Sequence, residues 1–444
     1  MSLPSYQKYE DTLALGLLPA HWQTKPLKWV SSINDEALPE TTPPDYQLEY
    51  VDIGSVSLGE GIEKTEYLAF KDAPSRARRI VRDGDVLVST VRTYLKAIAP
   101  IESPPENMIA STGFAVVRPN VGSVSGFLKY SLQSERFVDE VIARSTGVSY
   151  PAINASDLGR IYVSAPPVEE QTAIATFLDR ESTKIDGLIA EQEKLIALLA
   201  EKRQATISHA VTKGLNPDAP MKDSGVVWLG KVPALWRVGK IQNFAKRESG
   251  HTPSRQHPEW WENCTIPWFS LADVWQLRTG NIKYVYETKE LVSELGLANS
   301  SARLLPVGTV MLSRTASVGY SAIMGCDMAT TQDFINWVCK PELFPDFLLY
   351  VLRGMKSEFD RLMMGSTHQT IYMPDVAKLM MGLPPLDEQT GIVSFLDSET
   401  ARLDALTAEA TRGISLLKER RSALISAAVT GKIDVRHLAE AEAA

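Results

Sequence analysis

A segment of 47 residues occurs twice in this chain, and this repeat constrains the fold more than any other feature of the sequence. Residues 166–212 align without a gap with residues 384–430, so the two copies begin 218 positions apart. In the window that compares APPVEEQTAIATFLD with LPPLDEQTGIVSFLD, nine of the fifteen positions are identical. A chain of 444 residues exceeds the size of a single core, so we expect tandem units.

Weaker similarity extends upstream of each copy. GLLPAHW resembles GKVPALW, DGDVLVST resembles VGTVMLSR, and GFLKYSLQSERFVDEVI resembles DFLLYVLRGMKSEFDRL. Between the halves, the stretch KGLNPDAPMKDSG is rich in Gly, Pro and Asp, as linkers and turns are. The sequence therefore predicts a variable block (1–165), a repeated block with a linker (166–222), a second variable block (223–383) and a second repeated block (384–444).

Each repeated block has the features of one long helix. Pro-Pro precedes it, acidic residues stand at its expected start, and no proline occurs from Val168 to Asn216. Apolar residues recur at heptad-like spacing, so we expect the two helices to bury these stripes against each other, antiparallel if the variable blocks lie at opposite ends. The alternative is a helix packed only on its own domain. The residues expected in helix pairing or partner docking are Leu178, Ile185, Leu188, Leu195, Leu199, Leu396, Leu403, Leu406, Leu417 and Leu424.

The variable blocks combine short apolar strands with helical segments. Strands are expected at 85–90 and 96–100 around VRTYL, and at 309–313 and 320–325 around RTASVG. Residues 126–143 have the 3.6-residue period of a helix, and residues 159–167 form a strand that leads into the long helix. The predicted fold class is α+β: two tandem mixed domains separated by a pair of long antiparallel, coiled-coil-like helices.

Motifs for catalysis are lacking. There is no phosphate-binding G-x-x-x-x-G-K-[ST], no G-x-G-x-x-G turn and no G-x-S-x-G elbow. TPPDY (42–46) superficially resembles a methyltransferase loop, but its first residue is Thr, and His251, His257 and Cys264 match no tight zinc spacing. We therefore expect a binding protein that is not an enzyme and has no metal or cofactor of its own.

Composition and charge indicate the compartment and the region that binds. Three cysteines without a CxxC pair, no apolar run of 18 residues and no secretory leader predict a cytoplasmic protein. The net charge is −8, yet residues 223–383 carry 16 basic and 15 acidic residues, while residues 1–165 carry 16 and 20. Local patches decide whether nucleic acid binds, so the total charge does not exclude DNA.

Residues able to hydrogen-bond to bases and phosphates gather in corresponding loops of the two blocks. In the first block they are Arg76, Arg78 and Arg79 of RARRIVR, then Arg92, Thr93, Tyr94 and Lys96 of a hairpin tip, then Ser145, Thr146, Ser149 and Tyr150. In the second block they are Lys246, Arg247, Ser249, His251 and Arg255, then Arg314, Thr315 and Ser317 of the equivalent tip, then His368, Gln369 and Tyr372. The alternative for the arginine run is a solvated charged face.

The order of these blocks resembles the specificity subunit of Type I restriction-modification systems. The resemblance is carried by both PP-x-[DE]-EQ stretches at this spacing, by Trp22 and Trp236 after P-A-x, by GDVLVS and by ST before PAIN. It covers the chain from about Tyr9 to Gly431, and VRTYLKAIAP departs from the family's usual tip.

The resemblance implies a specific function. Each variable block would be a target-recognition domain that reads one half of a split, asymmetric double-stranded DNA target, and the helices would set the spacer. The helices would dock two methyltransferase subunits that use S-adenosylmethionine, and two motor-nuclease subunits that use ATP and Mg would join for cleavage. The alternatives are a two-domain scaffold that binds only protein partners, and an enzyme with a metal site near His251 and Cys264.

Overall fold

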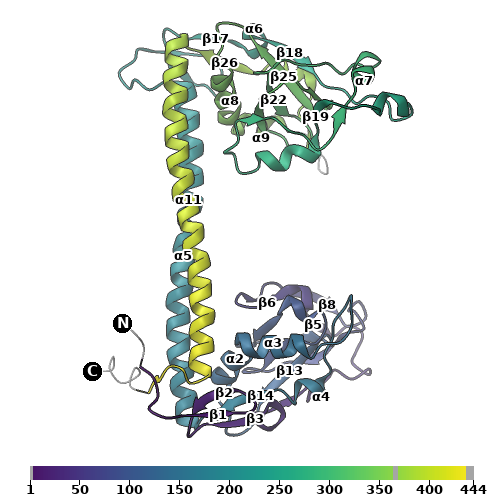
Figure 1. Cartoon of the computed structure of the whole chain (residues 1–444), viewed down its shortest axis with the longest axis vertical. Coiled ribbons are helices and arrows are strands. Elements are labelled where there is room, and N and C mark those ends of the chain that lie inside the picture. Colours follow the sequence, from purple (N-terminus) through teal and green to yellow (C-terminus); the bar gives the residue numbers. More distant parts are fainter. Residues whose placement is uncertain (1–3, 364–368, 437–444) are drawn as a thin grey trace. The chain divides into compact units, whose positions relative to one another are not determined.

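The computed structural model describes residues 4–363 and 369–436. The chain forms two compact units, unit 1 (residues 1–191 and 413–444) and unit 2 (residues 192–412). Each unit contains one variable block and parts of both long helices, which are α5 (Val168–Lys213) and α11 (Leu386–Val429) (Figure 1). No helix in the described part of the chain is long and apolar enough to cross a membrane.

The variable block of unit 1 is built on two four-stranded sheets. One sheet has the order β11-β10-β13-β4 and the other the order β8-β5-β12-β9, in which β12 pairs parallel with β5. The strands are β1 (Tyr9–Thr12), β2 (Gly16–Pro19), β3 (Gln23–Pro26), β4 (Ser31–Ile33), β5 (Gln47–Val51), β6 (Val56–Ser57), β7 (Gly61–Ile62), β8 (Glu66–Ala69), β9 (Ala77–Ile80), β10 (Val86–Ser89), β11 (Ile98–Pro100), β12 (Met108–Ser111), β13 (Phe114–Pro119) and β14 (Tyr162–Ala165). The helical segments are α1 (Leu27–Val30), η1 (Ile53–Ser55), η2 (Thr93–Leu95), α2 (Ser125–Gln133), α3 (Glu135–Ala143) and α4 (Ala155–Leu158).

The variable block of unit 2 repeats this plan. Its main sheet has the order β18-β25-β22-β23-β20, and β19 pairs parallel with β24 as β12 does with β5. The strands are β15 (Met221–Asp223), β16 (Lys231–Pro233), β17 (Arg237–Lys240), β18 (Ala245–Ser249), β19 (Ile266–Phe269), β20 (Tyr284–Val285), β21 (Leu291–Val292), β22 (Val310–Ser313), β23 (Ser321–Met324), β24 (Ala329–Thr330), β25 (Phe334–Cys339) and β26 (Met380–Leu383). The helical segments are α6 (Ile241–Phe244), η3 (Pro258–Trp261), η4 (Leu271–Leu277), α7 (Glu294–Ala298), α8 (Pro345–Gly354), α9 (Lys356–Leu362) and α10 (Met373–Val376).

The expected helix over residues 126–143 is two helices, because the chain breaks at Ser134. This residue has extended backbone angles, and its side chain caps α3 by accepting a hydrogen bond from the Phe137 N–H. The periodic pattern could not reveal the break, since both helices bury apolar residues in the same core. The strands expected on either side of the two hairpin tips are β10 with β11 and β22 with β23, both antiparallel.

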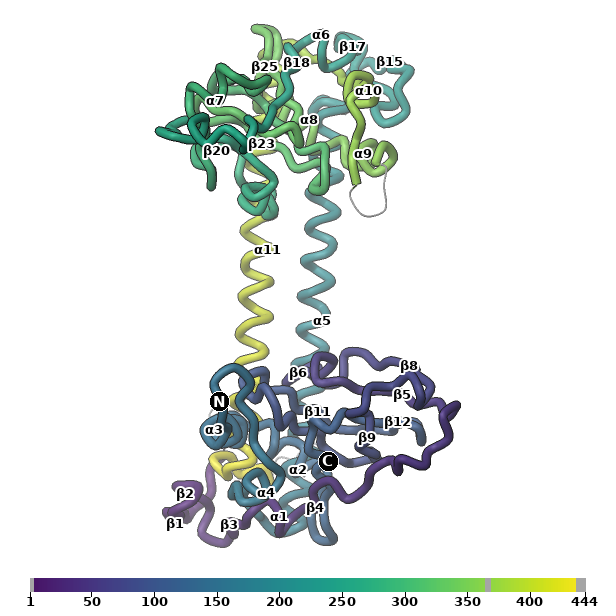
Figure 2. The backbone as a smooth tube through the Cα atoms, turned by 90° about the vertical axis from the view of Figure 1, so that its right-hand side faces the viewer, coloured from purple at the N-terminus to yellow at the C-terminus, as the bar shows by residue number. Residues whose placement is uncertain are grey.

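The two long helices, of 46 and 44 residues, pack antiparallel within each unit. In unit 1, Ile174 and Leu178 at the start of α5 share a core with Ile425 and Val429 at the end of α11. Figure 2 shows the course of the two helices as backbone tubes. In unit 2 the roles are reversed, because the end of α5, at Ile207, Ala210 and Val211, packs with the start of α11, at Ile392, Val393 and Leu396. Both units therefore have the same helical base made from opposite ends of the two helices.

The buried stripe of each helix differs in part from the predicted one. Leu178, Ile185, Leu199, Leu396 and Leu403 are buried, and Leu417 and Leu424 are half-buried. Leu188, Leu195 and Leu406, which were predicted for helix pairing or partner docking, lie outside this stripe, because their side chains are 53%, 42% and 44% exposed. The stripe continues one position later, at the buried Ile189 and the half-buried Ile196, and the alternating spacing of three and four residues carries it past Gln192 and Arg203.

Reciprocal ion pairs link the helices at equivalent positions of the repeat. The Arg203 guanidinium of α5 contacts the Asp404 carboxylate of α11 at 3.2 Å in unit 2. In unit 1 the Arg421 guanidinium of α11 contacts the Asp186 carboxylate of α5. Each arginine also lies close to a glycine with positive φ in the variable block of its unit. The Arg203 Nη2 donates a hydrogen bond to the Gly280 carbonyl at 3.0 Å. Gly59 approaches Arg421 so closely that a Cβ added at Gly59 would lie 2.7 Å from the Arg421 Nη2.

Residues that are identical in both copies of the repeat form hydrogen bonds between each variable block and its long helix. The Gln171 Oε1 accepts the Val124 N–H just before α2 at 2.9 Å, and the Gln389 Oε1 accepts the Phe344 N–H just before α8 at 2.8 Å. One helical stretch further on, the Tyr130 hydroxyl donates to Asp179 and the Tyr350 hydroxyl donates to Asp397, at 2.8 and 2.6 Å. The EQ and FLD motifs are therefore conserved between the copies because each holds the same helix.

Other residues of the repeat serve only one unit. The Glu170 carboxylate accepts hydrogen bonds from Tyr6 and Trp22 and pairs with His21, which joins the N-terminal segment to α5. Trp236, equivalent to Trp22, is fully buried, yet its indole N–H has no hydrogen-bond partner among the described residues. The tryptophan thus packs in both units, whereas the carboxylate contact exists only in the first.

Replacement of the buried Gln389 should destabilise unit 2. Gln389→Ala removes the acceptor for the Phe344 N–H and both bonds from Nε2, to the Glu342 and Pro384 carbonyls. We expect the free energy of unfolding to fall by about 2–4 kcal/mol, since buried polar groups lose their partners. The control is Thr390→Ala at the next, exposed position, with a change within about 0.5 kcal/mol. Equal effects of the two substitutions in denaturant unfolding would contradict this role for Gln389.

Candidate nucleic-acid interface

In unit 1 the hairpin tip and the following loop are joined into one surface. The tip between β10 and β11 forms an isolated bridge from Val91 to Ala152, and the Ile153 N–H donates to the Thr90 carbonyl at 2.9 Å. The Arg92 guanidinium lies 4.9 Å from the centre of the Tyr150 ring, within cation–π range. Two loops that are separate in the sequence thus present Arg92 and Tyr150 together.

The predicted residues of this surface divide into exposed and buried members. Tyr94, Lys96, Thr146, Ser149, Tyr150 and Arg92 are exposed. Thr93 is buried, and its Oγ1 donates to the Ser145 Oγ at 2.7 Å, so this pair holds the two loops together. Thr93 was predicted to contact DNA directly. Because its hydroxyl is already bonded to Ser145, the structure favours a role in positioning the loops.

The hairpin tip of unit 2 is built in the same way. An isolated bridge joins Thr315 to Thr370, the Ile371 N–H donates to the Arg314 carbonyl at 2.9 Å, and the Ala316 N–H donates to the Gln369 carbonyl at 2.9 Å. The Arg314 Nε donates to the Gln332 carbonyl at 3.1 Å, which fixes the guanidinium on the surface. Gln369 and Tyr372 are exposed beside it, Ser317 is half-buried, and His368 lies outside the described residues.

Three residues at the hairpin tips have strained, left-handed backbone angles. Arg92 and Lys96 flank η2 with φ angles of 51° and 54°, and Ala316 in unit 2 has φ of 59°. Left-handed backbone in residues other than glycine is uncommon, and it often occurs where a loop serves a function.

The arginine run of unit 1 is largely engaged within its own domain. Arg76 pairs with Asp52 at 3.2 Å, Arg78 lies 4.7 Å from the centre of the Phe70 ring, and burial lowers the pKa of Arg79, whose Nε is buried without a partner among the described residues. These contacts favour a role of the run in folding, with Arg76 as its most exposed member among the three predicted contacts.

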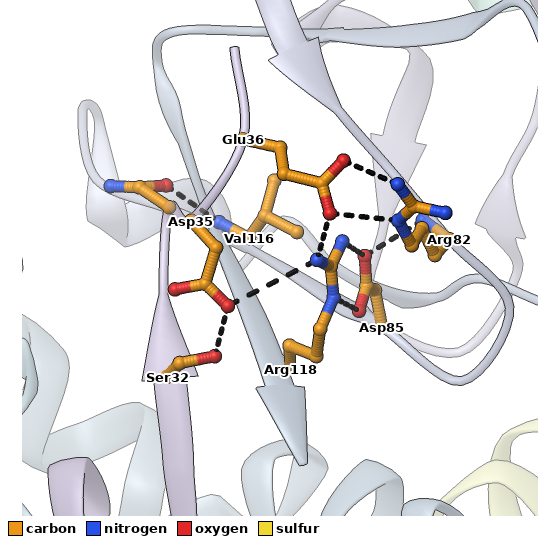
Figure 3. A network of polar contacts seen from close by, with 8 residues as sticks. Ser32, Asp35, Glu36, Arg82, Asp85, Val116 and Arg118 are labelled. Atoms are coloured by element: carbon orange, nitrogen blue, oxygen red, sulfur yellow. Dashed lines mark hydrogen bonds and ion pairs between the residues drawn. The ribbon is translucent and has the colours of Figure 1, made fainter. Parts of the chain in front are cut away.

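A network around Glu36 engages the last arginine of the run (Figure 3). The Arg82 guanidinium donates to both oxygens of Glu36, and Arg118 donates to Glu36 at 2.7 Å and to both oxygens of Asp85 at 2.8 Å. The guanidiniums of Arg82 and Arg118 lower the pKa of Glu36 to about 2. The carboxylates of Glu36 and Asp85 therefore neutralise the guanidiniums of Arg82 and Arg118. Through Glu36 and Arg118 the network connects the segment after β4 to β13.

The predicted residues on and after β18 are of two kinds. Arg247, Ser249 and His251 are exposed. Lys246 pairs with the buried Glu248 at 2.5 Å. Arg255 stacks 3.7 Å from the centre of the Trp261 ring and pairs with Glu290, so it is held in a structural contact. Within the described residues, no group of three or more His, Cys, Asp or Glu side chains could hold a metal ion.

In each unit, a variable block presents a hairpin tip and the loop bridged to it, and the block packs on a helical base. The family model "Type I restriction modification DNA specificity domain" matches residues 233–414. The putative Type I restriction enzyme MjaX specificity subunit of Methanocaldococcus jannaschii is 23% identical over 95% of this chain and 96% of its own length. The MjaIX specificity subunit of the same organism is 28% identical, and that match spans 38% of each chain.

Solved structures agree with this assignment at the level of the fold. One, described as "Structural basis underlying complex assembly and conformational transition of the type I R-M system", matches with a TM-score of 0.72 and 24% identity over 94% of this chain and 99% of that chain. The HsdS subunit from Thermoanaerobacter tengcongensis matches with a TM-score of 0.53 and 24% identity over 94% and 98%. The chain is therefore similar over almost its whole length to a specificity subunit of a Type I restriction-modification system, and its residues 233–414 match the DNA specificity domain of such systems. These similarities support a role in DNA target recognition.

Relief of the backbone strain at Arg92 separates a binding role from a folding role. Arg92→Gly should leave the free energy of unfolding unchanged or raise it, because glycine adopts positive φ without steric cost. If the guanidinium contacts DNA, affinity for the target duplex should fall about tenfold or more. Ser103→Gly, at an exposed position with φ of 47°, is the control and should leave DNA affinity unchanged. Wild-type affinity of the Arg92 variant in fluorescence anisotropy would exclude this contact.

Proposed function

We propose that each unit reads one half of a split, asymmetric DNA target, through the surface formed by its hairpin tip and the loop bridged to it. The observation that carries the proposal is the pair of equivalent bridges, Val91 to Ala152 and Thr315 to Thr370. The same backbone device presents Arg92, Tyr94 and Tyr150 in one unit and Arg314, Gln369 and Tyr372 in the other. Equal frames with different side chains are suited to reading two different sequences.

Arginine and glutamine side chains at these tips can contact base edges in the major groove. Arginine bonds guanine O6 and N7 together, and glutamine bonds adenine N6 and N7. The Arg314 Nε already donates to the Gln332 backbone carbonyl, which restricts the conformations of the guanidinium. Such preorganisation reduces the entropy lost when the contact with a base forms.

We further propose that the helices dock the methyltransferase subunits. Leu188 and Leu406 are exposed at equivalent positions of the repeat, and so are Leu198 and Leu416, at 52% and 54%. Apolar residues left in water at matching positions of two helices support contact with two copies of one partner. The two methyltransferase subunits would bring S-adenosylmethionine and methylate adenine after flipping the base. Two motor-nuclease subunits, which use ATP and Mg, would join for cleavage in the cytoplasm.

The Arg314 side chain offers the sharpest test of the reading surface. Arg314→Ala, in the complex with the methyltransferase subunits, should weaken binding to the correct target by roughly 1–3 kcal/mol if the residue reads a guanine. The variant should lose discrimination at one base pair of the half-site read by unit 2 and keep the preference of the other half-site. An equal loss on all sequences would identify Arg314 as a phosphate contact instead. A purely protein-binding scaffold would show no DNA affinity that falls steeply with salt.

Adjacent leucines of α5 should separate partner docking from helix pairing. Leu198→Asp places a charge at an exposed position, so folding should be unaffected while association with the methyltransferase weakens. Leu199→Asp buries a charge without a partner at a position that is 8% exposed, and should lower the free energy of unfolding by about 3 kcal/mol or more. Thermal unfolding and sedimentation of the two variants with the methyltransferase subunit measure both effects. Wild-type association of the Leu198 variant would move the docking surface elsewhere.

A further inference from the structure

Unit 2 contains a cavity of about 370 Å³ between α5, the end of η4, the β22–β23 turn and the α8–α9 corner. Four basic side chains line it, namely Arg203, Arg278, Arg353 and Lys356, against one lining carboxylate, Asp360. Its wall includes Val318, Gly319, Tyr320 and Ser321, which directly follow the tip residues Arg314 to Ser317. The cavity thus opens beside the hairpin to which the reading of DNA is assigned above.

Two guanidiniums meet inside this cavity on one acceptor. The Arg203 Nη2 and the Arg353 Nη1 both donate to the Gly280 carbonyl, at 3.0 and 2.9 Å. Arg353 has no carboxylate among its recorded hydrogen-bond partners in the described chain, and burial together with the charge of Arg203 lowers its pKa to about 10. Asp404 balances Arg203, whereas Arg353 has no carboxylate partner of its own, and like charges held this close favour an anion beside them.

Polar atoms in the cavity also lack partners. Ser321 is 4% exposed, and its Oγ has no hydrogen-bond partner in the described part of the chain; the same holds for the buried Arg203 Nε. A hydroxyl and an N–H that are both buried and unbonded carry a cost that a bound acceptor would remove. Hydroxyl and guanidinium donors, which both line this cavity, are typical ligands of a phosphate group.

The equivalent cavity of unit 1 provides an internal comparison. It lies against Arg421 and Tyr130 as the unit 2 cavity lies against Arg203 and the helix that contains Tyr350. Its cations are paired, since Lys418 contacts Glu60 at 3.1 Å, Arg421 contacts Asp186, and Lys129 contacts Glu102 and Asp179 at 3.0 and 2.9 Å. Gln133 stands where unit 2 has Arg353. Arg203 is paired with Asp404 as Arg421 is with Asp186, so the two cavities differ in Arg278, Arg353 and Lys356, which line the unit 2 cavity and have no ion pair among the described residues.

We propose that the unit 2 cavity binds a phosphate group, and that in the assembled complex this is a backbone phosphate of the target DNA beside the half-site read by unit 2. The assignment to DNA rests on the proposed function. Arg278 and Lys356 are exposed at the cavity and attract the phosphate, while Arg203, Arg353 and Ser321 surround it more deeply. This contact carries no sequence information, but it fixes the position of the reading loops on the duplex.

The test compares the wild-type complex with a variant that carries Arg278→Gln and Lys356→Gln, both at exposed positions. Target affinity should fall about tenfold, equally on duplexes altered in either half-site, because one charge-assisted contact is lost. The slope of log affinity against log salt should become shallower by about 0.9, the value for one phosphate. Lys418→Gln, at the balanced cavity of unit 1, is the matched control and should leave the slope unchanged. An unchanged slope in the double variant overturns the proposal.

A second measurement identifies the source of the phosphate. In a series of target duplexes with one neutral methylphosphonate each, one position should weaken wild-type binding and have no further effect on the double variant. If no position shows this coupling while inorganic phosphate raises the melting temperature of the wild type but not of the variant, the ligand is a free anion and the DNA assignment is overturned. A wild-type complex that fails to bind any target would instead refute the proposed function itself.

Discussion

The antiparallel pairing of α5 and α11 is the interaction on which the rest of each unit depends. Neither helix could remain ordered over its length in water by propensity alone, and each buries its stripe against the other and against a recognition block. The reciprocal pairs of Arg203 with Asp404 and Arg421 with Asp186 fix the register, because a shift of either helix would separate both partners. Since each arginine also reaches a loop glycine, the same residues join the helical base to the domain that reads DNA.

Conservation between the two halves of the chain follows from this arrangement. Gln171 and Gln389 hold the start of α2 and α8, and Asp179 and Asp397 hold the tyrosines of the same helices. The residues that fasten the blocks are therefore identical, whereas the tips that face outward differ. Differences between the tips therefore leave unchanged the way in which each block is held.

Much of the architecture could be predicted from the sequence, because the repeat and its periodicity record contacts within the chain. The long helices, the strands around both tips and the family all follow from residues 166–212, their second copy and the motifs upstream. The sequence could not separate Leu188, Leu195 and Leu406, which are exposed, from the buried stripe, because that stripe passes through the polar residues Gln192 and Arg203. Those polar residues are tolerated there since Arg203 finds Asp404 and Gly280, contacts that no periodic pattern reveals.

The candidate site was harder to predict than the fold. The correspondence of the loops was visible in the sequence, yet the bond between Thr93 and Ser145 and the stacking of Arg255 on Trp261 depend on contacts between distant segments. The cationic cavity of unit 2 was missed altogether, because Arg203, Arg278, Arg353 and Lys356 come from four separate elements and form no local charge run.

If each unit reads its own half of a split DNA target, a change in one unit must alter one half of the methylated motif. A genome-wide map of adenine methylation measures this in cells that contain this chain and its methyltransferase subunits, with either the wild-type tip of unit 2 or an altered tip at residues 314–317. We expect a motif of two specific halves separated by unread base pairs, in which the altered tip changes one half and preserves the other. A single continuous motif, or a change in both halves at once, would contradict it.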